Sequence, residues 1–152
     1  MQEPDPNTLT TQLQDIWYKE IPLSKSMELS IESFANNQLI TRANLAPNVN
    51  VHGTAFAGSL YSVQALTGWG MMYLQTQMMG LDASILIAKG NIDYSLPVNQ
   101  DIIAICQFDG YESEIKSLLE DGKARFHLKC AVGLGDSVAS TFDGVYVVKI
   151  RA

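Results

Sequence analysis

Apolar and polar residues alternate along six stretches of this chain, which is the pattern of β-strands with one buried face and one wetter face. The stretches cover about residues 27–31, 39–45, 86–98, 102–108, 124–134 and 138–148. Asn36 and Asn37 separate the first two stretches and suit a tight hairpin turn. In the third stretch the alternation places Leu86 and Ala88 on the buried face. The pattern predicts an antiparallel sheet with another layer packed against one side.

Two segments have the pattern of helices. The segment from about residue 55 to 79 is rich in Ala, Leu, Met and Gln and contains no proline. It lies in a run, residues 43–81, without Asp, Glu, Lys or Arg, so we expect protein to surround this helix on all sides. Near the N-terminus, Thr8 is expected to cap a short amphipathic helix that stops before Pro22.

The predicted order is a short helix, two strands, a long helix and four strands. Such an order indicates an α+β fold in which an antiparallel six-stranded sheet wraps around one long central helix. The chain has 152 residues and shows no internal repeat and no linker rich in Pro or Ser. We therefore expect residues 1–152 to form a single domain.

Charge and composition exclude several classes of function. Sixteen acidic and ten basic residues give a net charge of −6, which argues against nucleic acid and anionic membranes as partners. No stretch suits a transmembrane span or a secretory signal, so a cytoplasmic protein is expected. Cys106 and Cys130 lie on apolar faces and are interpreted as buried, reduced thiols. Two histidines and two cysteines, widely spaced, do not predict a metal site.

A polar, glycine-containing segment precedes the central helix. Residues 48–59 read Asn-Val-Asn-Val-His-Gly-Thr-Ala-Phe-Ala-Gly-Ser. With Trp69-Gly70, Ile92-Asp93-Tyr94 and Leu96-Pro97-Val98, this segment resembles the thioesterase-like domain at the C-terminus of some bacterial GNAT-type acetyltransferases, a hotdog fold. The resemblance extends from about residue 9 to residue 148.

The resemblance implies a cytoplasmic bacterial thioesterase acting on acyl-CoA or on an acyl-carrier thioester. It also implies a homodimer, or a tetramer built from dimers, in which sheets join edge to edge. Backbone N–H groups at the start of the central helix would polarise the thioester carbonyl, since a helix N-terminus presents free donors and a positive dipole end. Coenzyme A would arrive as part of the substrate, so no further cofactor is expected.

Four residues are the catalytic candidates. Asn50 would orient a water molecule or hold the carbonyl, or it simply forms a turn. His52 would act as a base or contact the carbonyl, or it is an exposed loop residue. Ser59 would position water; its surroundings do not form a nucleophile elbow. Asp93 is the carboxylate candidate from outside the helix, unless it is a solvated strand residue.

Other residues in the same segment are candidates for substrate binding. Gly53 and Thr54 would offer N–H groups to the oxyanion, although Thr54 is equally suited to cap the central helix. Gly58 would allow a close approach of ligand and backbone. Asn48 would shape the loop, and Phe56 would contact the substrate at the start of the helix.

The segment departs from many hotdog thioesterases in one respect. Those enzymes carry Asp or Glu about two turns into the helix, whereas residues 59–64 read Ser-Leu-Tyr-Ser-Val-Gln. Two alternatives therefore stay open: a non-catalytic module that binds acyl thioesters, and a dehydratase or hydratase. Lys123 and Arg125 share a strand face with His127 and Lys129. This stripe would contact the phosphates of coenzyme A, or it is ordinary surface alternation.

Overall fold

The computed structural model describes residues 4–151. The helices are α1 (Pro6–Glu20), α2 (Pro22–Ser26), the short 3-10 helix η1 (Ala46–Asn48), α3 (Ala57–Met78) and α4 (Glu112–Asp121). The strands are β1 (Leu29–Ala35), β2 (Gln38–Ala43), β3 (Ala83–Tyr94), β4 (Ile102–Gln107), β5 (Lys123–Leu134) and β6 (Ser137–Ile150).

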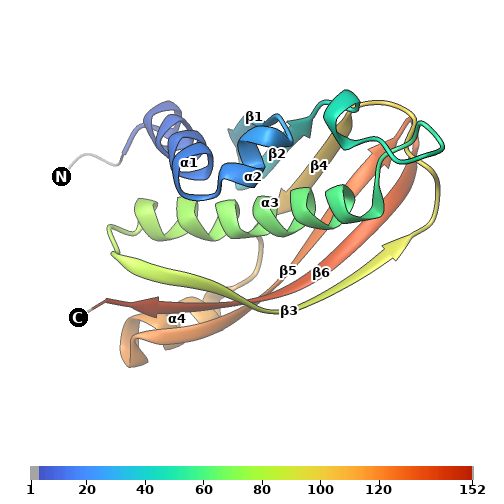
Figure 1. Cartoon of the computed structure of the whole chain (residues 1–152). Helices are drawn as coiled ribbons and strands as arrows, with labels where there is room; N and C mark the ends of the chain where they lie inside the picture. Colours follow the sequence, from blue (N-terminus) through green and yellow to red (C-terminus); the bar gives the residue numbers. More distant parts are fainter. Residues whose placement is uncertain (1–3, 152) are drawn as a thin grey trace.

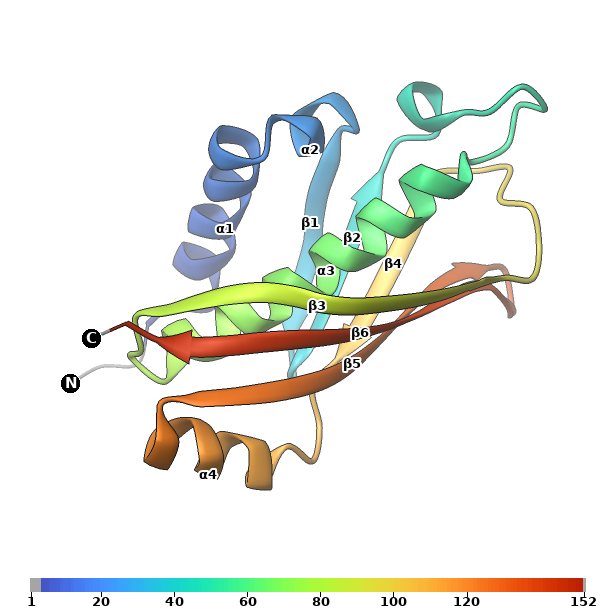
Figure 2. The same cartoon turned by 60° about the horizontal axis from the view of Figure 1, so that its bottom comes forward.

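The six strands form one antiparallel sheet in the order β1-β2-β4-β5-β6-β3. The central helix α3 lies across one face of this sheet, and α1 and α2 lie on the same side (Figure 1). Figure 2 shows the strands curving around α3. The expected architecture is therefore confirmed. The hairpin between β1 and β2 is confirmed as well, since Asn36 and Asn37 both adopt positive φ angles, 52° and 58°.

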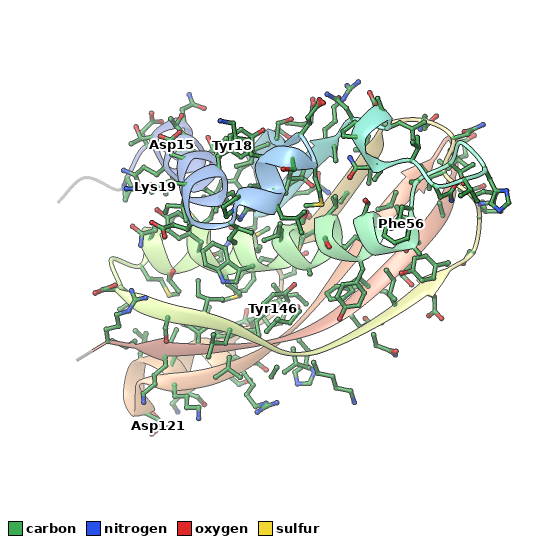
Figure 3. The ribbon with its side chains drawn as sticks, in the orientation of Figure 1. Asp15, Tyr18, Lys19, Phe56, Asp121 and Tyr146 are labelled. Atoms are coloured by element: carbon green, nitrogen blue, oxygen red, sulfur yellow. The ribbon has the colours of Figure 1, made fainter. Side chains whose placement is uncertain are left out.

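The central helix packs against the sheet through close contacts at glycine. The ring of Tyr146 is fully buried, and its hydroxyl donates to the carbonyl oxygen of Ala65 at 2.7 Å. A Cβ atom on Gly68 would lie 2.2 Å from that hydroxyl oxygen, so only glycine fits there. Figure 3 shows Tyr146 between α3 and the sheet. Within the single chain α3 is not surrounded on all sides as expected, because a stripe of its residues stays half-buried.

Helix α1 covers the β1 edge of the sheet. Gln14 acts there like a residue of a neighbouring strand, since its amide donates to Leu29 O and accepts from Ile31 N, both at 2.9 Å. A strand edge covered in this way is closed to further pairing. The helix itself starts earlier than expected. Thr8 is not the N-cap, because Pro6 occupies the first turn and the cap position falls on Asp5.

The opposite edge, β3, pairs only with β6 among residues 4–151. A register shift between Ile87 and Lys89 interrupts its alternation. Because of this bulge, Ile85 faces the core, whereas Leu86 is 66% exposed and Ala88 is exposed too. The prediction that Leu86 and Ala88 face the core is therefore wrong. The β3 edge carries exposed apolar side chains and free backbone groups.

Helix α4 has no counterpart among the elements that the sequence pattern predicts. It packs beside the first half of β5, where β4 no longer pairs with that strand. Tyr111 closes the gap, since its hydroxyl donates to His127 O at 2.7 Å and its ring stacks on Phe108. Cys106 and Cys130 are buried, free thiols, as expected from their apolar faces. The structure adds that they lie opposite each other on β4 and β5.

Candidate functional site

The N-terminus of α3 presents free hydrogen-bond donors. Phe56 is the N-cap residue, and its N–H donates to Asn48 O at 2.7 Å. No side chain caps the helix, and the first intrahelical bond runs from Leu60 N to Phe56 O. Along the described chain, the N–H groups of Ala57, Gly58 and Ser59 therefore have no partner. These donors and the helix dipole favour a negative charge at this point.

A hollow of about 310 Å³ opens beside this helix start, on the side of α2. Gly58, Ser59 and Ser62 line it from α3, and it is called here the α2-side hollow. Phe56 contributes a half-exposed ring at its mouth (Figure 3). That ring lies directly over Gly58, where a Cβ atom would meet Phe56 Cε2 at 2.4 Å. The missing side chain of Gly58 thus leaves room for the Phe56 ring against the first turn of α3.

A second hollow, of about 280 Å³, lies on the other side of the helix start and is called here the β3-side hollow. Tyr94 lines it from the end of β3, and its hydroxyl donates to Ala57 O at 2.9 Å. Burial, together with the neighbouring Tyr61, raises the pKa of Tyr94. The phenol therefore stays protonated at neutral pH and ties the end of β3 to the start of α3.

Asn50 organises the loop that leads to α3. Its Oδ1 accepts from His52 N at 2.8 Å and from Thr54 N at 3.2 Å, while its Nδ2 donates to Thr54 Oγ1 at 2.9 Å. The N–H of Gly53 donates to Asn50 O at 3.2 Å. The donors expected at Gly53 and Thr54 are thus used inside the loop, and Thr54 does not cap α3. The free donors lie further along, in the first turn of the helix.

Asn48 holds the loop before α3 in place through its buried side chain. Its side chain is 2% exposed and donates through Nδ2 to Met27 O at 2.9 Å and to Asn44 O at 2.7 Å. Its own carbonyl receives the N–H of Phe56. Asn48 therefore connects α2, η1 and the start of α3, which confirms its expected role in shaping the loop. It also contacts the α2-side hollow.

Two of the catalytic candidates lie away from both hollows. His52 is exposed in the loop and lines neither hollow. Asp93 is exposed on the outer face of β3, because its neighbours Ile92 and Tyr94 point toward α3. No Asp, Glu or His lines either hollow in the described part of the chain. The structure brings Ser59 to the helix start and leaves these two residues outside it.

The cationic stripe lies on the sheet face that points away from α3. Lys123, Arg125, His127 and Lys129 are all exposed on β5, while the residues between them are buried. None of the four makes an ion pair within residues 4–151. The stripe is thus separated from both hollows by the sheet, and its contact with coenzyme A phosphates stays a prediction.

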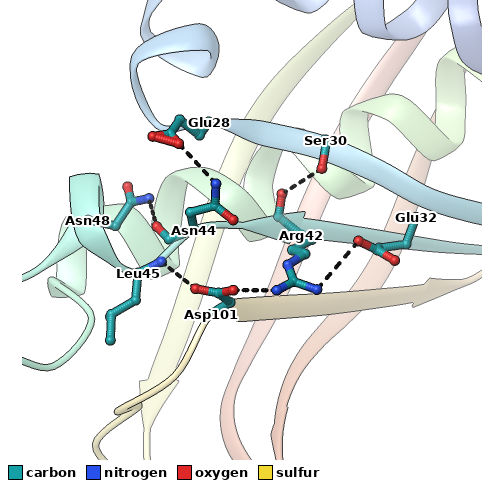
Figure 4. Close-up of polar contacts among 8 residues, drawn as sticks. All are labelled: Glu28, Ser30, Glu32, Arg42, Asn44, Leu45, Asn48 and Asp101. Atoms are coloured by element: carbon teal, nitrogen blue, oxygen red, sulfur yellow. Dashed lines mark hydrogen bonds and ion pairs between the residues drawn. The ribbon is translucent and has the colours of Figure 1, made fainter.

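The sequence did not predict a carboxylate clamp on the loop before α3. Asp101 accepts from Leu45 N at 2.7 Å and pairs with Arg42, which also approaches Glu32 at 3.9 Å (Figure 4). Leu45 O in turn accepts from Asn48 N at 2.8 Å. The clamp therefore fixes the segment that carries Asn48. Asp101 lies 56 residues from Leu45, so no local pattern could reveal it.

The clamp predicts a pH-dependent difference in stability. The bond from Leu45 N, followed by the pairing with Arg42, lowers the pKa of Asp101 below its ordinary 3.8. Its contribution is therefore present above pH 3.8 and is lost as the pH falls through the lowered value. We expect Asp101→Asn to melt below the wild type at pH 7 and together with it near pH 2. Thermal melts across this range test this, with Asp136→Asn in an exposed turn as the control. A difference that persists unchanged in acid would contradict it.

A six-stranded antiparallel sheet curved around one long helix is the architecture of the hotdog fold. The chain belongs to the family described as "Putative thioesterase (yiiD_Cterm)", which matches residues 10–150. The match covers all the strands and the whole of α3.

Solved structures agree with this assignment. A protein of unknown function from Chlorobaculum tepidum is 31% identical, with a TM-score of 0.90 over 96% of this chain and 97% of that one. A "putative thioesterase" from Shewanella oneidensis is 34% identical, with a TM-score of 0.88 over 95% and 99%. A Pseudomonas aeruginosa protein titled "Probable Thioesterase" is 18% identical, with a TM-score of 0.79 over 98% and 99%, and supports the fold alone.

Two further findings concern the described residues only. None of their helices combines the length and apolar character needed to cross a bilayer. Nor do three or more His, Cys, Asp or Glu side chains gather there in a group able to hold a metal ion.

Proposed function

We propose that this protein hydrolyses acyl thioesters of coenzyme A or of a carrier protein at the start of α3. The main observation in support of this proposal is the set of free N–H groups beside the α2-side hollow. In this proposal the N–H groups of Gly58 and Ser59 donate to the thioester oxygen. Negative charge develops on that oxygen during attack, so donors fixed in place beforehand stabilise the transition state more than the substrate.

Water is the nucleophile in this proposal. Its oxygen bonds to the carbonyl carbon and the C–S bond breaks, giving a carboxylic acid and a free thiol. One proton of the water passes through the Ser59 hydroxyl, which accepts it on one side while donating its own proton to the departing sulfur. Ser59 suits this relay because its hydroxyl makes no hydrogen bond to the rest of the described chain. Asn50 holds the loop and does not contact the substrate.

The functional unit in this proposal is a homodimer formed through β3. Of the two sheet edges, α1 covers β1, whereas β3 is open and carries apolar side chains such as Leu86 and Tyr94. Open apolar edges pair readily, and a two-fold axis lets the same edge serve both copies. Analytical ultracentrifugation tests this part: a monomer at micromolar concentration would contradict it.

Release of free thiol from a series of acyl-CoA esters tests the proposed activity. We expect saturable turnover by the wild type and a decrease in kcat of about 100-fold in Ser59→Ala, the range seen when a proton-transfer group is removed. Ser113→Ala provides a matched control, because Ser113 is an exposed serine in α4 and lines neither hollow. Equal turnover by the wild type and Ser59→Ala would contradict the relay.

A second candidate function is binding of acyl thioesters without hydrolysis. The specific observation in its favour is that no Asp, Glu or His lines either hollow in the described residues. Saturable binding of acyl-CoA by calorimetry, together with no thiol release above background, would favour this candidate over the enzyme.

A further inference from the structure

A third hollow, of about 590 Å³, lies at the other end of α3 and is larger than either hollow at the helix start. It lies between the end of α1, the last turns of α3 and the first residues of β3, and is called here the distal hollow. Trp69 and Tyr73 form the aromatic part of its wall, with stacked rings 6.0 Å apart. Isoleucines add apolar surface, and Glu20 and the ion pair of Asp82 with Arg151 also line the hollow. The indole is held in place because Trp69 Nε1 donates to Ile85 O at 2.9 Å. Its size suits a fatty acyl chain better than an acetyl group.

The half-buried stripe on α3 connects the helix start with the distal hollow. Its positions recur three or four residues apart, as on one side of a helix: Gly58, Tyr61, Ser62, Ala65, Leu66, Trp69, Tyr73 and Gln77. From Gly58 to Tyr73 it is roughly 22 Å long at the rise of an α-helix. Helices α1 and α2 border it on one side and β3 on the other. A second copy that pairs through β3 would cover it.

Two-fold symmetry fixes which parts of the two copies meet. Antiparallel pairing of two β3 strands puts the end of each strand beside the start of the other. The end of β3 is tied to the helix start through the bond from Tyr94 to Ala57. The start of β3, at residues 83–86, lines the distal hollow. Pairing near the middle of β3 would therefore bring the helix start of one copy next to the distal hollow of the other.

We propose that the distal hollow binds the acyl chain of the thioester held at the helix start of the other copy, and that Trp69 sets the longest chain that fits. This inference rests on the proposed function and adds the substrate class, which is fatty acyl thioesters. Each site is then incomplete in a single chain, since the donors and the acyl pocket come from different copies.

Chain-length profiles test the role of Trp69. We expect Trp69→Leu to raise the ratio of kcat/KM for hexadecanoyl-CoA to that for butanoyl-CoA about tenfold or more, because a smaller wall admits more methylene groups. Gln77→Trp, which fills the same hollow, should lower that ratio. Tyr111→Leu removes an aromatic ring beside α4 and should leave the ratio unchanged. Equal ratios in all four proteins would overturn the inference.

Mixed dimers test whether the pocket acts across the interface. One copy carries Gly58→Pro, which removes a proposed donor, and the other carries Trp69→Leu. Turnover then comes from the Trp69→Leu copy, in which Gly58 is intact. The acyl chain of the substrate held there would enter the distal hollow of the Gly58→Pro copy, which keeps Trp69. We expect the wild-type chain-length profile from this mixed dimer. The profile of the Trp69→Leu homodimer would instead place the pocket in the same chain and overturn the inference.

The inference can fail separately from the proposed function. If the wild type releases no thiol, hydrolysis is wrong, and calorimetry with thioether analogues of the same acyl-CoA esters becomes the test. Affinity that rises with chain length in the wild type and shifts to longer chains in Trp69→Leu would support the acyl pocket. Affinity independent of chain length in both proteins would overturn it.

Discussion

Gly58→Pro is expected to lower kcat for thioester hydrolysis by about 100- to 1,000-fold, the usual effect of removing one oxyanion donor. Proline has no N–H, and the first turn of a helix tolerates it because these N–H groups form no intrahelical bond. The substitution therefore removes the proposed donor of Gly58 while α3 keeps its internal hydrogen bonds. Steady-state thiol release at neutral pH measures the effect.

Two neighbouring variants separate the lost donor from other changes. Gly58→Ala keeps the N–H and adds only a Cβ atom, which the half-exposed ring of Phe56 can avoid by turning. Ala57→Pro removes the adjacent N–H, and Ala57 lines the β3-side hollow, not the α2-side hollow. We expect both to retain most of the activity lost in Gly58→Pro. A Gly58→Ala variant as inactive as Gly58→Pro would show that space, and not the donor, is critical.

Gly68→Ala is expected to lower the free energy of unfolding by about 2–3 kcal/mol, which combines overpacking, a disturbed buried hydrogen bond and a small gain in helix propensity. The added Cβ atom would lie 2.2 Å from the hydroxyl oxygen of Tyr146 and 2.6 Å from its Cζ atom. The Tyr146 ring cannot move away, because it is fully buried and its hydroxyl donates a hydrogen bond to Ala65 O. Urea unfolding followed by circular dichroism measures this change.

Gly133→Ala is the matched control for this prediction. Its nearest neighbour would be Ser137 O at 3.9 Å, an ordinary contact, so the same substitution should cost about 1 kcal/mol or less. If Gly68→Ala were as stable as the wild type, Tyr146 would have to be more mobile than its contacts indicate.

Much of the fold was predictable because its signals are local. The Asn36-Asn37 turn, the extent of α3 and most strand faces follow from residue type and spacing alone. The bulge at residues 87–89 was not predictable, because one extra residue reverses which side chains face the core without changing composition. Helix α4 was missed because it is short and covers a gap between strands that only the folded sheet creates.

The location of the candidate site could be predicted from the sequence, whereas its free hydrogen-bond donors could not. Residues 48–59 do lie at the start of α3, and Gly58 and Ser59 line a hollow there. Which N–H groups are free could not be foreseen, because this depends on how the Asn50 amide turns toward Thr54. The exposure of Asp93, in contrast, follows from its alternation with Ile92 and Tyr94, and it matches the solvated strand residue that the sequence left open as one reading.

The central claim is that N–H groups at the start of α3 hold the thioester carbonyl, and the infrared frequency of a bound carbonyl measures this directly. The probe is a ¹³C-labelled ketone analogue of acyl-CoA, in which a methylene group separates carbonyl and sulfur so that hydrolysis cannot occur. We predict that binding to the wild type lowers the stretching frequency below its value in water, and that Gly58→Pro removes most of this shift. An equal frequency in both proteins, with the probe bound equally well, would contradict the claim.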